Sequence, residues 1–127
     1  MSDALVQAAS PRRLLVVDDN PVNRKLAVAF VQRLGWQVEQ AEAGAEALRL
    51  LAARPFDMVL LDISMPQMSG EEVLAHIRQT PALAGLRVVA YTAHALPEEK
   101  QTLMALGFDD LLIKPVSLKS IEAVLLP

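Results

Sequence analysis

Four short apolar runs, separated by amphipathic stretches, constrain the fold of this chain more than any other feature. They cover residues 14–17, 58–61, 88–91 and 111–113. Apolar runs of this length, bounded by polar or turn-forming residues, are typical of strands that are buried on both faces of a parallel sheet. A fifth strand is expected at residues 37–40. Strand and helix alternate five times, which predicts an α/β domain with right-handed crossovers and helices over both faces of the sheet.

The first amphipathic stretch carries both the end signals and the periodicity of a helix. Pro21 suits the first helical position after an Asn20 cap, and Gly35 suits the end of the helix. Apolar residues recur there at every fourth position and are expected to form one buried stripe. The residues of this stripe are Val22, Leu26, Phe30 and Leu34.

The later amphipathic stretches predict four more helices. These are expected near residues 45–53, near residues 70–78, from Pro97 to Gly107, and after a Ser117 cap. The side chains expected to face the core are Leu48 and Leu51 in the first of these helices, Val73, Leu74 and Ile77 in the second, and Ile121, Val124 and Leu125 in the last.

The composition fits one globular domain and excludes several classes of protein. The chain has 127 residues, a net charge of -3 and no cysteine. Without cysteine it has neither a disulfide framework nor a thiolate metal site, and this absence fits a reducing cytoplasm. The negative net charge gives it no basic footprint of a nucleic-acid binder. The longest apolar stretch, residues 26–31, is too short to span a membrane. Residues 1–11 are expected to be a flexible tail and residues 12–127 the domain.

Polar side chains follow the apolar runs at the points where the predicted strands end. Asp18 and Asp19 follow the first run, Asp62 the second, Thr92 the third and Lys114 the fourth. In an open parallel sheet, ligands bind beyond the carboxyl ends of the strands. Three carboxylates, a hydroxyl and an ammonium are therefore expected at one edge of the sheet, an arrangement that suits a divalent cation and a phosphoryl group.

The three aspartates suggest phosphoryl chemistry, although each also has a simpler explanation. An aspartate can attack phosphorus and form an aspartyl-phosphate, and Mg²⁺ prefers one or two carboxylates together with water. Taken alone, Asp18 suits a helix start and Asp62 suits a turn. Taken together, crowded carboxylates are unfavourable unless a cation shares them, so the set favours a metal-dependent site in which Asp62 is the nucleophile.

Lys114 and Thr92 could each hold a phosphoryl oxygen and stabilise charge on the transferring group. Taken singly, a solvated lysine and a β-branched strand residue are the simpler explanations. Pro115 favours the functional interpretation of the lysine, because a fixed bend there would direct its side chain back across the sheet edge.

Four segments, in the observed order and spacing, resemble the receiver domains of two-component response regulators. These segments are LLVVDDNPVN, MVLLDISMPQMSG, VVAYTAHA and DDLLIKPV. The resemblance covers nearly all of residues 14–125, and its DDNPVN and YTAHA parts are most similar to receivers of hybrid sensor kinases. It implies a flavodoxin-like (βα)5 three-layer sandwich with a parallel five-stranded sheet in the order 2-1-3-4-5.

The resemblance also implies a role for each site residue. Asp62 would accept a phosphoryl group from a phosphohistidine on a sensor histidine kinase or a histidine-phosphotransfer domain. The implied Mg²⁺ ligands are Asp18, Asp19, Asp62 and the main-chain carbonyl of Ser64. Lys114 and Thr92 would hold phosphoryl oxygens, and the peptide bond between Lys114 and Pro115 would be cis.

The chain departs from the family pattern at two positions. Leu111 takes the place of an aromatic residue that swings inward on phosphorylation, which puts that route of signal readout in doubt. Ser69 replaces an aspartate in the turn after the phosphoacceptor, where a serine can make similar local hydrogen bonds. Ser64 and His94 occupy the positions that tune dephosphorylation in the family, although His94 could equally be an exposed loop residue.

The leading hypothesis is a signalling domain that catalyses only its own phosphorylation and dephosphorylation. One alternative is a pseudo-receiver, a binding module that signals without phosphate, for which Leu111 is the only support. A phosphohydrolase is disfavoured, because Ser64 stands where such enzymes place a general acid. A downstream protein would bind the fourth helix, fifth strand and fifth helix, where Leu118 and Leu125 contribute to the surface or to the core. No contact with nucleic acid or membrane is expected. Both a stand-alone receiver and a domain of a longer chain fit the sequence.

Overall fold

The computed structural model describes residues 12–93 and 96–125. Strands and helices alternate along these residues, as the sequence predicts. The order is β1 (Arg13–Val17), α2 (Pro21–Arg33), β2 (Gln37–Ala41), α3 (Gly44–Ala53), β3 (Met58–Asp62), α4 (Gly70–Gln79), a 3-10 turn η1 (Pro81–Leu83), β4 (Arg87–Thr92), α5 (Pro97–Leu106), β5 (Asp110–Ile113) and α6 (Leu118–Leu125). The sequence did not predict η1.

The five strands form one parallel sheet in the order β2-β1-β3-β4-β5, which confirms the predicted flavodoxin-like topology. The register aligns the strand ends that carry the polar residues. Val17 of β1 pairs with Leu61 of β3, and Asp62, the last residue of β3, pairs with Tyr91 of β4. The polar residues that follow the strands are therefore brought to one edge of the sheet.

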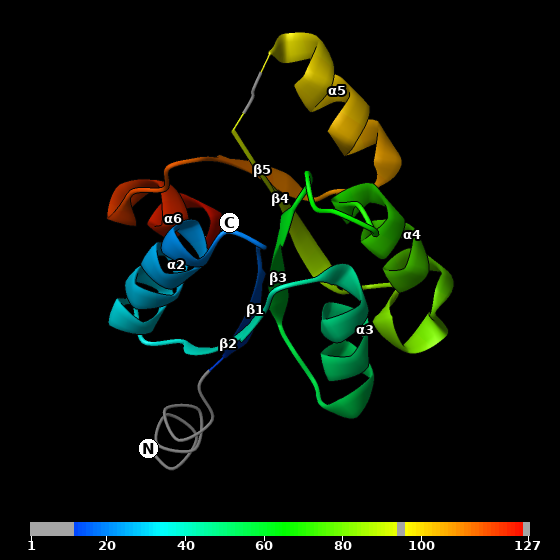
Figure 1. Cartoon of the computed structure of the whole chain (residues 1–127), viewed down its shortest axis with the longest axis horizontal. Helices are drawn as coiled ribbons and strands as arrows, with labels where there is room; N and C mark the ends of the chain where they lie inside the picture. Colours follow the sequence, from blue (N-terminus) through cyan, green and yellow to red (C-terminus); the bar gives the residue numbers. More distant parts are fainter. Residues whose placement is uncertain (1–11, 94–95, 126–127) are drawn as a thin grey trace, which may run out of the picture.

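Helices cover both faces of the sheet, and each face has its own hydrophobic cluster (Figure 1). One face packs under α3 and α4 and includes Leu61 and Ala90. The other face packs under α2 and α6 and includes Leu60 and Tyr91. Adjacent residues of a strand point to opposite faces, so Ala90 and Tyr91 of β4 belong to different clusters. The predicted core residues of α3, α4 and α6 lie in these two clusters, which confirms them.

The predicted helix ends are confirmed where the structure describes them. The side chain of Asn20 accepts hydrogen bonds from the backbone N–H groups of Val22 and Asn23 at the start of α2. Gly35 and Gly107, which follow α2 and α5, have φ angles of 94° and 116°, a region that glycine adopts without steric cost. The Ser117 hydroxyl accepts a hydrogen bond from the N–H of Ser120 in α6.

The predicted apolar stripe of α2 is partly wrong. Val22 is 73% exposed, and the buried residues of α2 are Arg24, Ala27 and Val31. The other three residues of the predicted stripe, Leu26, Phe30 and Leu34, are only partly buried beside the α2–α6 cluster. A helix has 3.6 residues per turn, so residues four apart drift by about 40° per step around its axis. Four such positions cannot all face one sheet.

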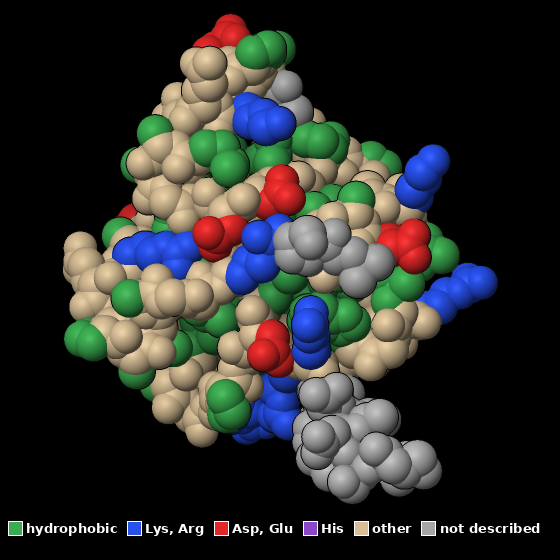
Figure 2. Space-filling model, turned by 180° about the vertical axis from the view of Figure 1, so that it is seen from behind, with side chains coloured by type: hydrophobic (Ala, Val, Ile, Leu, Met, Phe, Trp, Pro, Cys, Tyr) green, Lys and Arg blue, Asp and Glu red, His purple; other side chains and the backbone are tan. Residues whose placement is uncertain are grey.

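The surface carries charges of both signs. On the face in Figure 2, basic and acidic side chains alternate and do not gather into one patch. Within the described residues, no helix is long and apolar enough to cross a bilayer. The predictions for residues 1–11 and for His94 lie outside the described residues.

Candidate phosphoacceptor and metal site

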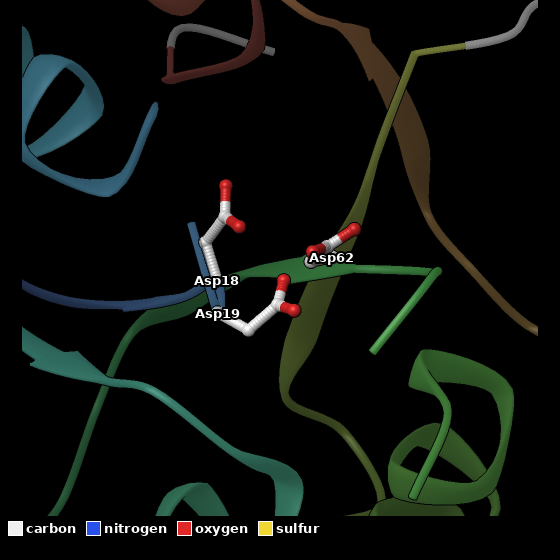
Figure 3. Close-up of side chains that lie close together, drawn as sticks. All are labelled: Asp18, Asp19 and Asp62. Atoms are coloured by element: carbon white, nitrogen blue, oxygen red, sulfur yellow. The ribbon is translucent and has the colours of Figure 1, made fainter. Parts of the chain in front are cut away.

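The three predicted aspartates meet beyond the carboxyl ends of β1 and β3 (Figure 3). These strands are neighbours in the sheet, so the turn after β1 lies beside the last residue of β3. One carboxylate oxygen from each of Asp18, Asp19 and Asp62 lies within 4.8 Å of the others. Asp18 and Asp62 are 0% and 2% exposed, whereas Asp19 faces solvent. The cluster is therefore buried on one side and open on the other.

Lys114 reaches this cluster from β5, across the end of β4. Its Nζ lies 3.1 Å from Oδ1 of Asp62 and 3.2 Å from Oδ2 of Asp18. The peptide bond between Lys114 and Pro115 is cis, as the family resemblance implied. The backbone N–H of Lys114 donates to the carbonyl of Thr92, which attaches the lysine to the end of the neighbouring strand. One ammonium thus lies beside two buried carboxylates.

Thr92 and Ser64 lie at the same edge, where two adjoining cavities open and Ser64 borders both. Thr92 ends β4 and is 8% exposed. A cavity of about 470 Å³ is lined by Asp19, Asp62, Ser64, Lys114 and residues at the start of α2. Thr92 lines an adjoining cavity of about 300 Å³, which Ser64 also lines. The structure therefore gathers all the predicted site residues at one edge, with Ser64 between the two cavities.

Burial raises the pKa of Asp62 to about 7. Loss of solvent around the carboxylate is the largest cause; the hydrogen bond and positive charge of Lys114 oppose it, and the charge of Asp18 adds to it. Ser64 N–H donates to Asp62 Oδ1 over 3.1 Å. The ionised form of Asp62 is thus only partly compensated by the surrounding protein groups, and a further positive charge would favour it.

The side chains fit a divalent cation such as Mg²⁺. Asp18 Oδ2 is buried and accepts no hydrogen bond from the described residues, although the Lys114 ammonium lies near it. An oxygen of this kind is costly to bury without a strong partner. Three carboxylates with one solvent-facing side match a hard ion that retains several waters. Of the predicted ligands, Asp18, Asp19 and Asp62 converge, and the carbonyl of Ser64 remains a prediction.

A buried arginine supports the acidic turn, and the sequence analysis did not identify it. Arg24 of α2 is 7% exposed. Its guanidinium donates to the backbone carbonyl of Asp18 over 2.8 Å, to Gln40 Oε1 over 2.9 Å and to Glu42 Oε1 over 3.3 Å. It therefore ties the turn after β1 to the end of β2. The signal that could have revealed the buried position of Arg24 is its spacing: Ala27 follows three residues later and Val31 four residues after that, which places all three on one face of a helix.

The loop after Asp62 is shaped by a glycine and a serine. A Cβ atom on Gly70 would collide with the carbonyl oxygen of Asp62, so only glycine allows α4 to start this close to Asp62. Ser69 caps α4: its hydroxyl accepts from the N–H of Glu72, and the Glu72 side chain accepts from the N–H of Ser69. This reciprocal pair confirms that Ser69 makes local hydrogen bonds in place of the family's aspartate.

Leu111 lies on the sheet face that α3 and α4 cover. It is half-buried and packs against that cluster. Its side chain is aliphatic and cannot make the hydrogen bonds of a tyrosine hydroxyl. Leu125 is part of the core and is 1% exposed, whereas Leu118 is half-buried.

Comparisons with known proteins agree with this geometry. Residues 14–126 match the family model of the response regulator receiver domain. The chain is similar to the sensor histidine kinase RcsC of Escherichia coli strain K12, at 40% identity over 124 residues, which is 98% of this chain and 13% of that protein. It is similar to the sensor protein GacS of Pseudomonas syringae pv. syringae, at 38% identity over 117 residues, 90% of this chain and 13% of that protein. The chain thus spans about an eighth of these relatives.

Solved structures show the same fold. The chemotaxis response regulator CheY4 of Vibrio cholerae superposes with a TM-score of 0.85 at 30% identity, over 91% of this chain and 96% of that one. The signal receiver domain of a histidine kinase from Syntrophus aciditrophicus gives a TM-score of 0.79 at 25% identity, over 89% and 86% of the two chains.

Proposed function

The chain belongs to the response regulator receiver domain family, and from that premise we propose that Asp62 is its phosphoacceptor. The observation that carries the proposal is the contact of Lys114 with both Asp18 and Asp62 beside the exposed carboxylate of Asp19. An ammonium and a potential cation site thus adjoin one carboxylate. This arrangement suits a reaction in which an anion attacks an anionic phosphoryl group.

In the proposed reaction, a carboxylate oxygen of Asp62 bonds to phosphorus as the phosphorus–nitrogen bond of a phosphohistidine breaks. The imidazole nitrogen takes the electron pair of that bond and leaves. Asp18, Asp19, Asp62 and the Ser64 carbonyl would hold Mg²⁺, which supplies positive charge to the phosphoryl oxygens. Lys114 and Thr92 would each bind a phosphoryl oxygen, and water would later hydrolyse the aspartyl-phosphate.

The proposed phosphodonor is a sensor histidine kinase or a histidine-phosphotransfer domain in the cytoplasm. This assignment is supported by the relatives, which include the sensor histidine kinase RcsC and the sensor protein GacS. We place a downstream protein on the face formed by α5, β5 and α6. On α5 and β5, the large apolar side chains of Met104, Leu106 and Ile113 are 40%, 50% and 40% exposed and would supply apolar contacts to such a partner.

Intact-mass analysis tests the proposal. The protein with Mg²⁺ and acetyl phosphate should gain one phosphate, and D62N or removal of Mg²⁺ by EDTA should abolish the gain. An unmodified wild-type protein, or a D62N variant that still gains phosphate, would contradict the proposal. An unmodified wild-type protein would favour the pseudo-receiver interpretation, which would also require that Mg²⁺ leave the amide resonances of Asp19 and Asp62 unshifted.

A further inference from the structure

Tyr91 is a buried aromatic residue that adjoins the site from the opposite face of the sheet to Leu111. It is the only tyrosine in the sequence and is 0% exposed. It precedes Thr92 on β4, so its side chain points into the cluster under α2 and α6, whereas Leu111 packs under α3 and α4. The site therefore has an aromatic neighbour on the α2–α6 side.

The ring of Tyr91 contacts the phosphate-binding lysine. The Lys114 Nζ lies 4.6 Å from the ring centroid, within the range of about 6 Å over which a ring face attracts a cation. The same ammonium lies 3.1 Å from Asp62 and 3.2 Å from Asp18. Two carboxylates and one ring face therefore surround this ammonium, and the ring is the only uncharged member of the three.

The hydroxyl of Tyr91 contacts a helix. It donates to the backbone carbonyl of Asn23, in the first turn of α2, over 3.3 Å. Burial, with the nearby charges of Asp18 and Asp62, raises the pKa of this phenol above its ordinary value, so the hydroxyl remains a donor. One rigid side chain thus contacts Lys114 with its ring and α2 with its hydroxyl.

A phosphoryl group on Asp62 would change the charges around the Lys114 ammonium. The negative charge would move outward from the carboxylate onto the phosphoryl oxygens, and the ammonium would follow it. Its distance from the ring would then change, because the ring is held by β4 and by the surrounding cluster. Leu111 has no comparable contact with Lys114 among those the structure describes.

We propose that Tyr91 positions the Lys114 ammonium and links it to α2, so that the start of α2 responds to phosphorylation of Asp62. This inference rests on the proposed function. Its two parts use different atoms of one residue: the ring acts on the lysine and the hydroxyl acts on the helix. Substitutions can separate them.

The test compares Y91F, Y91L and V89A in the full chain. Val89 lies two residues earlier on β4, in the same cluster and fully buried, so V89A perturbs the packing without touching Lys114. Phosphorylation by acetyl phosphate with Mg²⁺ is followed by intact mass. We expect Y91L to slow it by about tenfold, and Y91F and V89A to stay within about twofold of wild type.

The second measurement is the ¹³C resonance of the Asn23 carbonyl. It should shift on phosphorylation in the wild type and in V89A, and the shift should be lost in Y91F, which keeps the ring and lacks the hydroxyl. This readout would not respond to a purely structural role, and Y91F preserves the packing if Y91L fails to fold.

Two results would overturn the inference: a Y91F protein that keeps the carbonyl shift, or a V89A protein that is phosphorylated as slowly as Y91L. Both require a wild-type protein that gains phosphate, which separates them from failure of the proposed function.

Discussion

The charged groups at the two edges of the sheet are paired in different ways. Near the amino-terminal ends of the strands, several arginines pair with acidic side chains: Arg78 lies 2.9 Å from Asp109, and Arg54 lies 2.9 Å from Glu39. At the carboxyl-terminal edge, the carboxylates of Asp18, Asp19 and Asp62 cluster together, and the ammonium of Lys114 contacts two of them, Asp18 and Asp62. The first edge resembles ordinary structural pairing, whereas the second holds an excess of buried negative charge that disfavours the folded state.

The two edges also differ in how completely their polar groups are satisfied. Arg78 also donates to the backbone carbonyls of Ala84, Leu86 and Gly107. Hydrogen bonds therefore satisfy many groups at the amino-terminal edge, although the buried Nε of Arg87 has no partner among the described residues. At the other edge, Asp18 Oδ2 lacks a hydrogen bond from the described residues, and the pKa of Asp62 is raised to about 7. Such a surplus of carboxylates suits the proposed site, because a bound cation would share their negative charge beside a phosphoryl group.

The largest expected effect is on the rate of phosphorylation. K114M removes the ammonium but keeps a side chain of similar length, so it should slow phosphorylation by acetyl phosphate by about 100-fold or more. The same substitution at Lys119, exposed on α6, is the matched control and should leave the rate within twofold. A phosphorylation rate of K114M close to that of K119M would show that Lys114 does not contribute to the proposed reaction.

The next effect is on stability at the opposite edge. R78M removes a donor from three backbone carbonyls and from Asp109, so the free energy of unfolding should fall by about 3 kcal/mol in urea titrations. Phosphorylation of the folded variant should be unchanged. R33M, at an exposed arginine of α2, should cost less than about 0.5 kcal/mol. If R78M slowed phosphorylation as K114M does, the two edges would not be independent.

Replacement of Asp62, the proposed phosphoacceptor, should stabilise the protein in the absence of Mg²⁺. The ordinary pKa of an aspartate is 3.8, and burial raises that of Asp62 to about 7. Below the ordinary pKa, Asp62 is neutral in both states; as pH rises towards the raised value, the unfolded state ionises first and folding is penalised. The advantage of D62N should therefore be absent near pH 4, grow as the pH approaches 7, and then level off.

The difference between the ordinary pKa of 3.8 and the raised pKa of about 7 limits the stabilisation by D62N to about 4 kcal/mol. We expect about 1 to 3 kcal/mol at pH 8, because Lys114 loses a charged acceptor. Urea unfolding across this pH range measures it, and saturating Mg²⁺ should reduce the difference. A D62N protein that is less stable than wild type at pH 8 would show that the negative charge of Asp62 does not destabilise the folded state.

The smallest expected effect is at an exposed pair of the amino-terminal edge. The side chain of Arg54 is 45% exposed, so R54A should change the free energy of unfolding by only about 0.5 kcal/mol, and less at high salt. A loss of 2 kcal/mol would mean that this edge depends on ion pairs more than their exposure allows.

Most of the fold could be predicted from the sequence, because strand burial and helix ends are local signals. The runs at residues 58–61 and 88–91 lie within β3 and β4, and Asn20 caps α2. The convergence of Asp18, Asp62 and Lys114 followed from sheet topology alone, since parallel strands place their carboxyl ends together.

What could not be predicted depends on partners that are distant in the sequence. The spacing of Arg24 with Ala27 and Val31 could indicate that it lies on the buried face of α2, but its acceptors on Asp18, Gln40 and Glu42 come from other segments that no local pattern identifies. Periodicity alone placed Val22 inside, although it is 73% exposed. The role of Tyr91 likewise depends on which face of β4 it occupies and on where Lys114 extends beyond β5.

The most direct test of the account is to locate the phosphate. The protein is incubated with Mg²⁺ and acetyl phosphate, reduced with borohydride, which converts an aspartyl-phosphate to homoserine, and analysed by peptide mass spectrometry. The account predicts homoserine at position 62 and at no other aspartate. Homoserine at position 18 or 19, or an unreduced peptide that still carries phosphate on a hydroxyl, would contradict it.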